Sequence, residues 1–207
     1  MTQTADTAST QRLDRQLAFL AEAEKLKGVV RATPVMDDSR FENSAEHSWS
    51  LALWALVLAD QAAPEVDPVR AIKMLLLHDI VEIDVGDVPI HSAGGKAHDS
   101  AEIAAAEDRA AERIFGLLPA DMAEDFLATW REFEANETPT AIYAKSLDRA
   151  QPVMLNLQSG GGSWREYKVT WTQLEDRVGC KINRGIPGVW EAIKARIFPW
   201  FQDNRRV

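Results

Sequence analysis

The chain has 207 residues, of which 46% are hydrophobic and 27% charged, a balance typical of a globular protein with one sizeable hydrophobic core. Its formal net charge of −9 argues against a nucleic-acid polymer as the main partner, although a bound cation can offset this charge locally for a small phosphate ester. The longest apolar run, residues 51–59, is far shorter than the ~20 residues that cross a bilayer, so we expect no membrane partner. With a single Cys180 and a polar N-terminus unlike a signal peptide, the sequence predicts a cytoplasmic protein.

The first part of the chain is predicted to hold two helices separated by a loop. Residues 1–9 read as a flexible tail, and the first helix begins after residue 9 or 10, opening a single domain over residues 10–207. A proline and a DDSR turn place a loop at residues 28–41. Asn43 can cap the second helix, where Glu46 closes a capping box. On the first helix, Leu13, Leu17 and Leu20 share one face, and on the second an inward stripe is formed by His47, Leu51, Trp54 and Leu58.

A third helix is predicted from Asp67-Pro68, where a capping acid precedes proline at the first helical position. It continues through His78 and ends at Gly86, and residues 91–98, which contain two adjacent glycines, form another loop. The apolar positions of this helix are Ile72, Leu75, Leu76 and Ile80.

Three more helix starts are predicted near Asp99, after Pro119 and at Thr138-Pro139. The last of these helices bends or stops near Pro152, because proline removes a backbone donor. The remaining features are a flexible break at residues 159–163, one strand-like run at residues 167–171 and a final helix with Val189, Trp190, Ile193 and Ile197. Successive amphipathic helices with short breaks predict an all-α helical bundle.

Two titratable residues, His78 and Asp79, follow directly on the apolar run of the third helix. Burying ionisable groups is costly unless they are paired or bind a metal. A divalent ion accepts both imidazole and carboxylate ligands, but adjacent helical residues point about 100° apart, so other helices must supply further ligands. His47 and Asp148 are available, although each alone is more often a capping, packing or solvated residue.

Three ordered motifs carry a family resemblance: ENSAEHSW at residues 42–49, LLLHDIVEIDVGD at 75–87 and AKSLDRAQP at 144–152. Together they resemble the HD-domain phosphohydrolase superfamily over about residues 10–200, and the acid after the His-Asp pair resembles its 5′-deoxynucleotidase branch. The resemblance implies an all-α HD-domain bundle with one divalent transition-metal ion, which could be Mn, Co, Zn, Fe or Ni. The implied ligands are His47, His78, Asp79 and Asp148.

The same resemblance implies roles for residues around the metal. Glu82 would be the catalytic residue, which positions or deprotonates the attacking metal-bound water or protonates the leaving oxygen. Asp87 would bind the sugar 3′-hydroxyl, with a simple turn residue as the alternative. Arg31 and Arg40 are candidates for binding the substrate phosphate, because guanidinium forms bidentate hydrogen bonds with phosphate. Ala32 stands where the branch has tryptophan, which leaves the choice of nucleotide open.

The leading hypothesis is therefore a phosphohydrolase that acts on a nucleoside 5′-monophosphate. One alternative is a dinuclear phosphodiesterase or a di-iron oxygenase, which would need His91 or His98 as further ligands; we interpret both as loop residues. Another is a non-catalytic, metal-binding regulatory dimer. Because dimers are common in the resembled family, we expect a homodimer, and we assign its interface to some of Trp164, Trp171 and Trp190.

Overall fold

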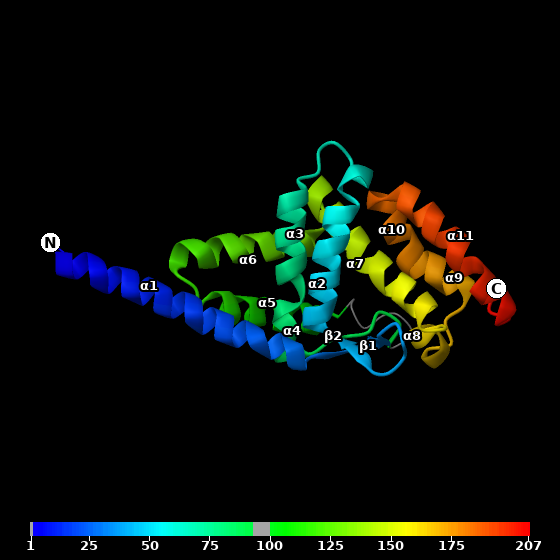
Figure 1. Cartoon of the computed structure of the whole chain (residues 1–207), viewed down its shortest axis with the longest axis horizontal. Coiled ribbons are helices and arrows are strands. Elements are labelled where there is room, and N and C mark those ends of the chain that lie inside the picture. The colour runs from blue at the N-terminus through cyan, green and yellow to red at the C-terminus, as the bar shows by residue number, and fades with distance from the viewer. Residues whose placement is uncertain (1, 93–99) are drawn as a thin grey trace.

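The computed structural model describes residues 2–92 and 100–207, and nearly all of its regular structure is helical, which confirms the predicted all-α class (Figure 1). The strands of these residues are β1 (Val30–Pro34) and β2 (Phe41–Asn43), which pair antiparallel with Val30 opposite Asn43. The prediction of a continuous loop at residues 28–41 is therefore wrong. The hairpin closes through a turn in which Asp38 adopts a positive φ of 57°, a conformation that aspartate tolerates.

The N-terminal helix α1 (Thr2–Ala23) begins earlier than predicted and continues into η1 (Glu24–Gly28). Its N-terminal end projects from the body of the molecule (Figure 1). Phe19 makes the inward contact, with its ring centroid 6.3 Å from that of Phe115 and 5.9 Å from that of Phe126. The three leucines that share one face of this helix are exposed: Leu13, Leu17 and Leu20. The flexibility of residues 1–9 stays a prediction.

The second helix, α2 (Ser44–Val57), starts as predicted. The Asn43 side chain accepts a hydrogen bond from the Glu46 backbone N–H at 2.9 Å, and the Glu46 carboxylate accepts one from the Asn43 N–H at 3.2 Å. This capping box fixes the first turn, where His47 points inward and is fully buried. A short turn, η2 (Ala59–Gln61), follows the helix.

The third helix, α3 (Pro68–Leu77), is capped by Asp67 as predicted, but it does not continue unchanged through His78. The chain tightens into the 3₁₀ turn η3 (His78–Val81), and then forms α4 (Glu82–Val85), which ends at Gly86 with φ of 76°. With three residues per turn, side chains three apart project from the same side of the chain. The tight turn therefore places the side chains of Asp79 and Glu82 on the same side of the chain.

Two helices cover one side of η3: α5 (Ala101–Phe115) and α6 (Ala120–Ala135). Ser100 caps α5, and Asn136 ends α6 in the left-handed conformation with φ of 53°. They enclose a smaller hydrophobic core with α1 and η3, made of Phe19, Leu77, Ile80, Val81, Ala110, Ala111, Ile114, Phe115, Leu118 and Trp130. This core holds the His78 region against the rest of the molecule, and the indole N–H of Trp130 donates to the His78 backbone carbonyl at 3.1 Å.

The long helix α7 (Pro139–Gln158) runs through the centre of the molecule (Figure 1). Of the two predicted outcomes at Pro152, a bend or a stop, the helix does not stop, because buried side chains on both sides of the proline, including Ala150 and Val153, hold it in place. The glycine break follows at residues 159–163, where Gly161 has φ of 112° and lies against the Trp200 ring.

The C-terminal part of the chain is a series of short helices. They are α8 (Gly162–Glu166), α9 (Trp171–Leu174), the π-helical turn η6 (Glu175–Gly179), α10 (Cys180–Gly185) and α11 (Pro187–Asp203). The strand-like run at residues 167–171 forms no strand, because Thr170 instead caps α9 in a second capping box.

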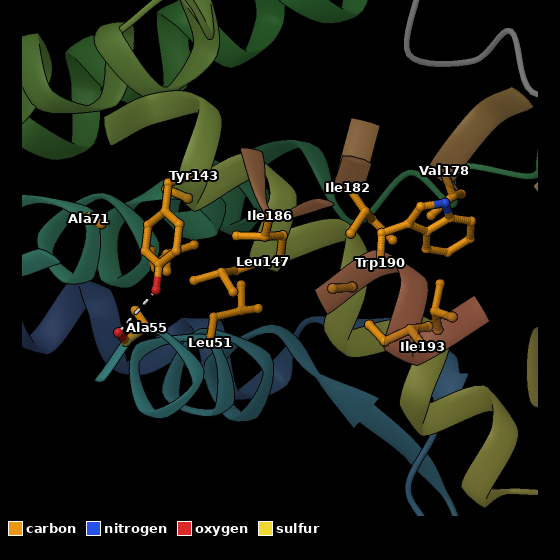
Figure 2. Packing of buried hydrophobic residues seen from close by; sticks show 14 of the residues in the cluster. Leu51, Ala55, Ala71, Tyr143, Leu147, Val178, Ile182, Ile186, Trp190 and Ile193 are labelled. Atoms are coloured by element: carbon orange, nitrogen blue, oxygen red, sulfur yellow. Dashed lines mark hydrogen bonds between the residues drawn. The ribbon is translucent and has the colours of Figure 1, made fainter. Parts of the chain in front are cut away.

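The main core forms where α2, α3, α7, α10 and α11 meet, and Figure 2 shows side chains from these elements packed together. The Tyr143 hydroxyl donates to the Ala55 carbonyl at 3.2 Å inside this core. Trp164 and Trp190 are also buried within the chain, so they cannot form the dimer face that the sequence had suggested. Trp171 packs on Phe198 of its own chain, with ring centroids 4.8 Å apart.

Candidate metal centre and active site

Three of the side chains that the sequence singled out as metal ligands, His78, Asp79 and Asp148, line one pocket of about 380 Å³, and the fourth, His47, lies next to Asp148. His47 comes from the first turn of α2, His78 and Asp79 from the start of η3, and Asp148 from the middle of α7. Both histidines and Asp148 are buried. Three separate elements thus bring these groups together, and side-chain caps fix the starts of α2, of α7 and of α3, the helix that leads into η3.

The possible ligand atoms are close to one another. His47 Nε2 lies 3.1 Å from Asp148 Oδ1, and His78 Nε2 lies 3.7 Å from the same oxygen and 2.9 Å from Asp79 Oδ1. One ligand atom from each of His47, His78 and Asp79 can be chosen so that all lie within 4.8 Å of one another. The structure therefore brings together all four residues proposed as ligands.

In each of the two histidines, the hydrogen bond made by Nδ1 determines which ring nitrogen carries the proton and whether Nε2 has a lone pair for a ligand. His78 Nδ1 lies 2.9 Å from the Leu75 carbonyl oxygen, which can only accept, so this nitrogen carries the proton. His47 Nδ1 lies 3.0 Å from Gln151 Oε1, an acceptor as well. In a neutral ring, Nε2 would present a lone pair to carboxylate oxygens, and the raised pKa of His78 indicates that without a metal its Nε2 holds a proton toward Asp79. Two such acceptors repel each other unless a proton or a metal ion lies between them, so this donor set fits a divalent ion.

The charges of these groups follow from their surroundings. Burial lowers the pKa of His78, but the adjacent Asp79 and Asp148 outweigh it and raise the pKa to about 10. Burial and the nearby Arg31 lower the pKa of His47 to about 4. Burial opposes ionisation of Asp79 and Asp148, yet neighbouring cationic groups hold both pKa values below the ordinary one. Both carboxylates are thus ionised and able to bind a cation.

A buried chain of side chains orients His47, and the sequence reasoning did not find it. Gln151 accepts from His47 Nδ1 and donates through Nε2 to Glu42 Oε1 at 3.2 Å. Burial raises the pKa of Glu42 to about 7. One signal was present in the sequence, because Gln151 follows Asp148 by three positions and so shares its face of α7.

Arg31, on β1, lies among the acids of the pocket. Its Nη1 is 2.7 Å from Asp79 Oδ2, 3.3 Å from Asp87 Oδ1 and 3.6 Å from Glu82 Oε1. Burial disfavours a charged guanidinium, but these carboxylates raise the pKa of Arg31 above its ordinary value. Glu42 Oε2 also lies 4.0 Å from Arg31 Nε. Nη1 of Arg31 therefore faces three acids of the protein, while Nε of the same guanidinium is buried without a hydrogen-bond partner among the described residues.

Glu82 and Asp87 lie beside one another at the edge of this cluster. Glu82 Oε2 accepts from the Ser44 hydroxyl at 2.5 Å, and burial together with the charge of Asp79 raises the pKa of Glu82 to about 9. Burial also raises the pKa of Asp87. The raised pKa values show that the surrounding groups do not fully stabilise the ionised forms of these acids, and a bound cation nearby would favour ionisation.

Arg40 is the one predicted site residue that the structure places elsewhere. Its exposed guanidinium pairs with the Glu46 carboxylate at 2.7 Å and 2.8 Å, and it does not line the pocket. His91, by contrast, is buried, lines the pocket and lies near Tyr167, with ring centroids 6.3 Å apart. Among the residues that the structure describes, the group of possible metal ligands does not include His91. His98, the other histidine of the predicted loop, lies outside the described residues.

Comparison with known proteins agrees with the resemblance seen in the sequence. Residues 23–190 match the family model of the HD domain. The chain is 40% identical to a predicted metal-dependent phosphohydrolase from Magnetospirillum magnetotacticum MS-1 whose crystal structure is known, with a TM-score of 0.85 over 93% of this chain and 96% of that one.

Two curated relatives are more distant. The 5′-deoxynucleotidase HDDC2 of Homo sapiens is 28% identical in a region that spans 67% of this chain and 65% of the human protein. The 5′-deoxynucleotidase yfbR of Photorhabdus temperata is 25% identical over 79% of this chain and 84% of its own length. With a family match that covers most of its length and this agreement in structure, the chain belongs to the HD domain family.

Proposed function

We propose that the chain is a metal-dependent phosphohydrolase that removes phosphate from a nucleoside 5′-monophosphate, with deoxynucleotides as the first candidates. The observation that carries this proposal is the donor set of His47, His78, Asp79 and Asp148, whose nitrogen lone pairs and carboxylate oxygens converge in a pocket beside Glu82. The names of the 5′-deoxynucleotidase relatives support the choice of substrate class.

The proposed ligands would hold one divalent ion. When bound, such an ion supplies positive charge to phosphate oxygens and makes a water more acidic. The family resemblance implies Mn, Co, Zn, Fe or Ni as the bound ion, and the mixture of imidazole and carboxylate ligands suits each of these metals. Gln151 holds His47 with Nε2 toward the other ligands, and the Leu75 carbonyl does the same for His78.

The residues around the ligands would position the reacting groups. Ser44 engages one oxygen of Glu82, which leaves the other oxygen on the side of Arg31 and the pocket. We assign to Glu82 the transfer of a proton from the attacking water or to the leaving oxygen. Arg31 holds Asp79 and Asp87 in place, and Asp87 stays the candidate for binding a sugar hydroxyl.

The test is a screen for released phosphate with nucleoside monophosphates, in which Mn²⁺, Co²⁺, Mg²⁺ and Zn²⁺ are added separately to metal-stripped protein. We expect turnover with at least one ion and no turnover without metal. Absence of phosphate release from every nucleotide with every ion would overturn the proposal. The presence of Glu82 in the cluster favours an enzyme over a metal-binding regulatory protein.

We further propose that the chain forms a homodimer, as expected from the family, but through a different face. The outer sides of α2 and α3, which pack against each other, expose apolar side chains: Trp49, Leu53, Leu56, Val57, Val69 and Leu76. Exposed apolar patches of this kind mark interfaces. Light scattering at micromolar concentration should report twice the chain mass, and Leu56→Glu should give the monomer.

The cytoplasmic location and the absence of a membrane partner are predictions made from the sequence alone. Across the part of the chain that the structure describes, no helix combines the length and the apolar character needed to cross a bilayer. A cytoplasmic location stays a prediction, made from the single Cys180 and the polar N-terminus.

A further inference from the structure

The substrate of a phosphohydrolase carries a negatively charged phosphate, and of the two arginines that the sequence suggested for it, Arg40 lies outside the pocket and Arg31 is paired with acids through Nη1. The Arg31 guanidinium is surrounded by Asp79, Glu82 and Asp87, and Arg40 lies outside the pocket on Glu46. A phosphate that enters this acidic pocket still needs a cationic partner from the protein.

Other cationic side chains line the opposite wall of the pocket, on α7 and α10: Lys145, Arg149, Lys181 and Arg184. Lys145 is already engaged, because its ammonium lies 3.1 Å from a Glu134 oxygen and over the Phe133 ring at 4.5 Å. Arg149 is different. Its Nε is buried without a hydrogen-bond partner, and its nearest ionic partner is Asp148 Oδ2 at 3.7 Å.

A buried donor without a partner costs about 1–3 kcal/mol, so such a group in a pocket needs an explanation. The position of Arg149 supplies one. Asp148 directs Oδ1 to His47 and His78, and its Oδ2 faces Arg149, so a single carboxylate separates the guanidinium from the candidate metal centre. A phosphate with one oxygen at this centre has further oxygens that can reach the guanidinium.

We propose that Arg149 binds the phosphate group of the substrate. This inference rests on the proposed function, because it takes the pocket as the place where the phosphate ester binds. The guanidinium would donate hydrogen bonds to phosphate oxygens and offset the negative charge of the neighbouring acids. Arg149 thereby takes the role that the sequence offered to Arg40, and it acts from α7 while Arg31, on β1, stays a second candidate.

The experiment compares Arg149→Gln and Arg149→Lys with Arg165→Gln. Arg165 pairs with Asp38 on the surface, and its substitution makes the same change in net charge away from the pocket. Each protein is loaded with Mn²⁺, and three quantities are measured: metal content, affinity for inorganic phosphate by calorimetry, and kcat/KM for a nucleoside monophosphate. Inorganic phosphate serves as the probe because it is the product of the proposed reaction.

Arg149→Gln should weaken phosphate binding and lower kcat/KM by about 10- to 100-fold, since a hydrogen bond to a charged group contributes about 1.5–3 kcal/mol. Arg149→Lys should recover part of this loss, and Arg165→Gln should match wild type. Metal content should not fall in Arg149→Gln, because removing a positive charge beside Asp148 does not weaken cation binding. Loss of metal in that variant would instead make Arg149 a support for Asp148 and overturn the inference.

The inference and the proposed function can fail separately. If wild type hydrolyses nucleotides and Arg149→Gln binds phosphate equally well, the inference is wrong and the function stands. If wild type hydrolyses no phosphate ester but loses phosphate affinity on Arg149→Gln, the function is wrong and the phosphate site stands.

Discussion

The hydrogen-bond chain from His47 through Gln151 to Glu42 allows a specific prediction about metal affinity. Gln151→Leu keeps the approximate volume of the side chain but removes the acceptor for His47 Nδ1, 3.0 Å away, and the donor to Glu42, 3.2 Å away. Each lost hydrogen bond contributes about 1 kcal/mol, and the His47 N–H and the Glu42 oxygen are left buried without partners. Loss of such outer-shell partners typically weakens metal binding by about 10- to 100-fold.

The assay titrates metal-stripped protein with Mn²⁺ and Zn²⁺ and determines each dissociation constant. Gln158→Leu is the matched control, because it makes the same substitution at the exposed end of the same helix. We expect weaker binding of both ions by Gln151→Leu, with Gln158→Leu unchanged. If Gln151→Leu binds metal as tightly as wild type while remaining folded, either His47 is not a ligand or Gln151 does not orient it, and the tautomer argument fails.

Three further substitutions test the remaining assignments. Asp79→Ala should lose both metal, measured by elemental analysis, and activity, because the ion loses a charged ligand and Arg31 its closest acid. Glu82→Gln should keep its metal but lower kcat by ~10²–10⁴-fold, as expected for a positioned proton-transfer group; full activity would make it a structural acid, and metal loss would make it a ligand. Arg40→Gln should leave kcat/KM within about twofold of wild type, since its surface ion pair lies outside the pocket.

Local signals in the sequence were sufficient to place most helices. A cap forms through a few adjacent residues, so Asn43 with Glu46, and Asp67 before proline, could be assigned from their spacing alone. The direction in which a helix face points is a tertiary property, however. The leucine stripe of α1 has good helical spacing but faces solvent, because Phe19 on another side of the helix makes the core contacts. Periodicity shows that a stripe exists and does not show what covers it.

The charge pattern of the site depends on segments that helical periodicity could not describe. The β1–β2 hairpin carries Arg31 into the pocket and Glu42 to the Gln151 side chain, although its residues read as a loop. The 3₁₀ turn at His78 places Glu82 three residues from Asp79 on the same side of the chain, where the Ser44 hydroxyl can reach it. Because Arg31 and the raised pKa of Glu82 reduce the repulsion between the acids, they can lie close together without an ion, while Asp79 and Asp148 stay ionised and able to bind a dication. The hairpin thus sets how strongly the pocket attracts a metal, and α7 supplies both a metal ligand and, at Arg149, the proposed contact to phosphate.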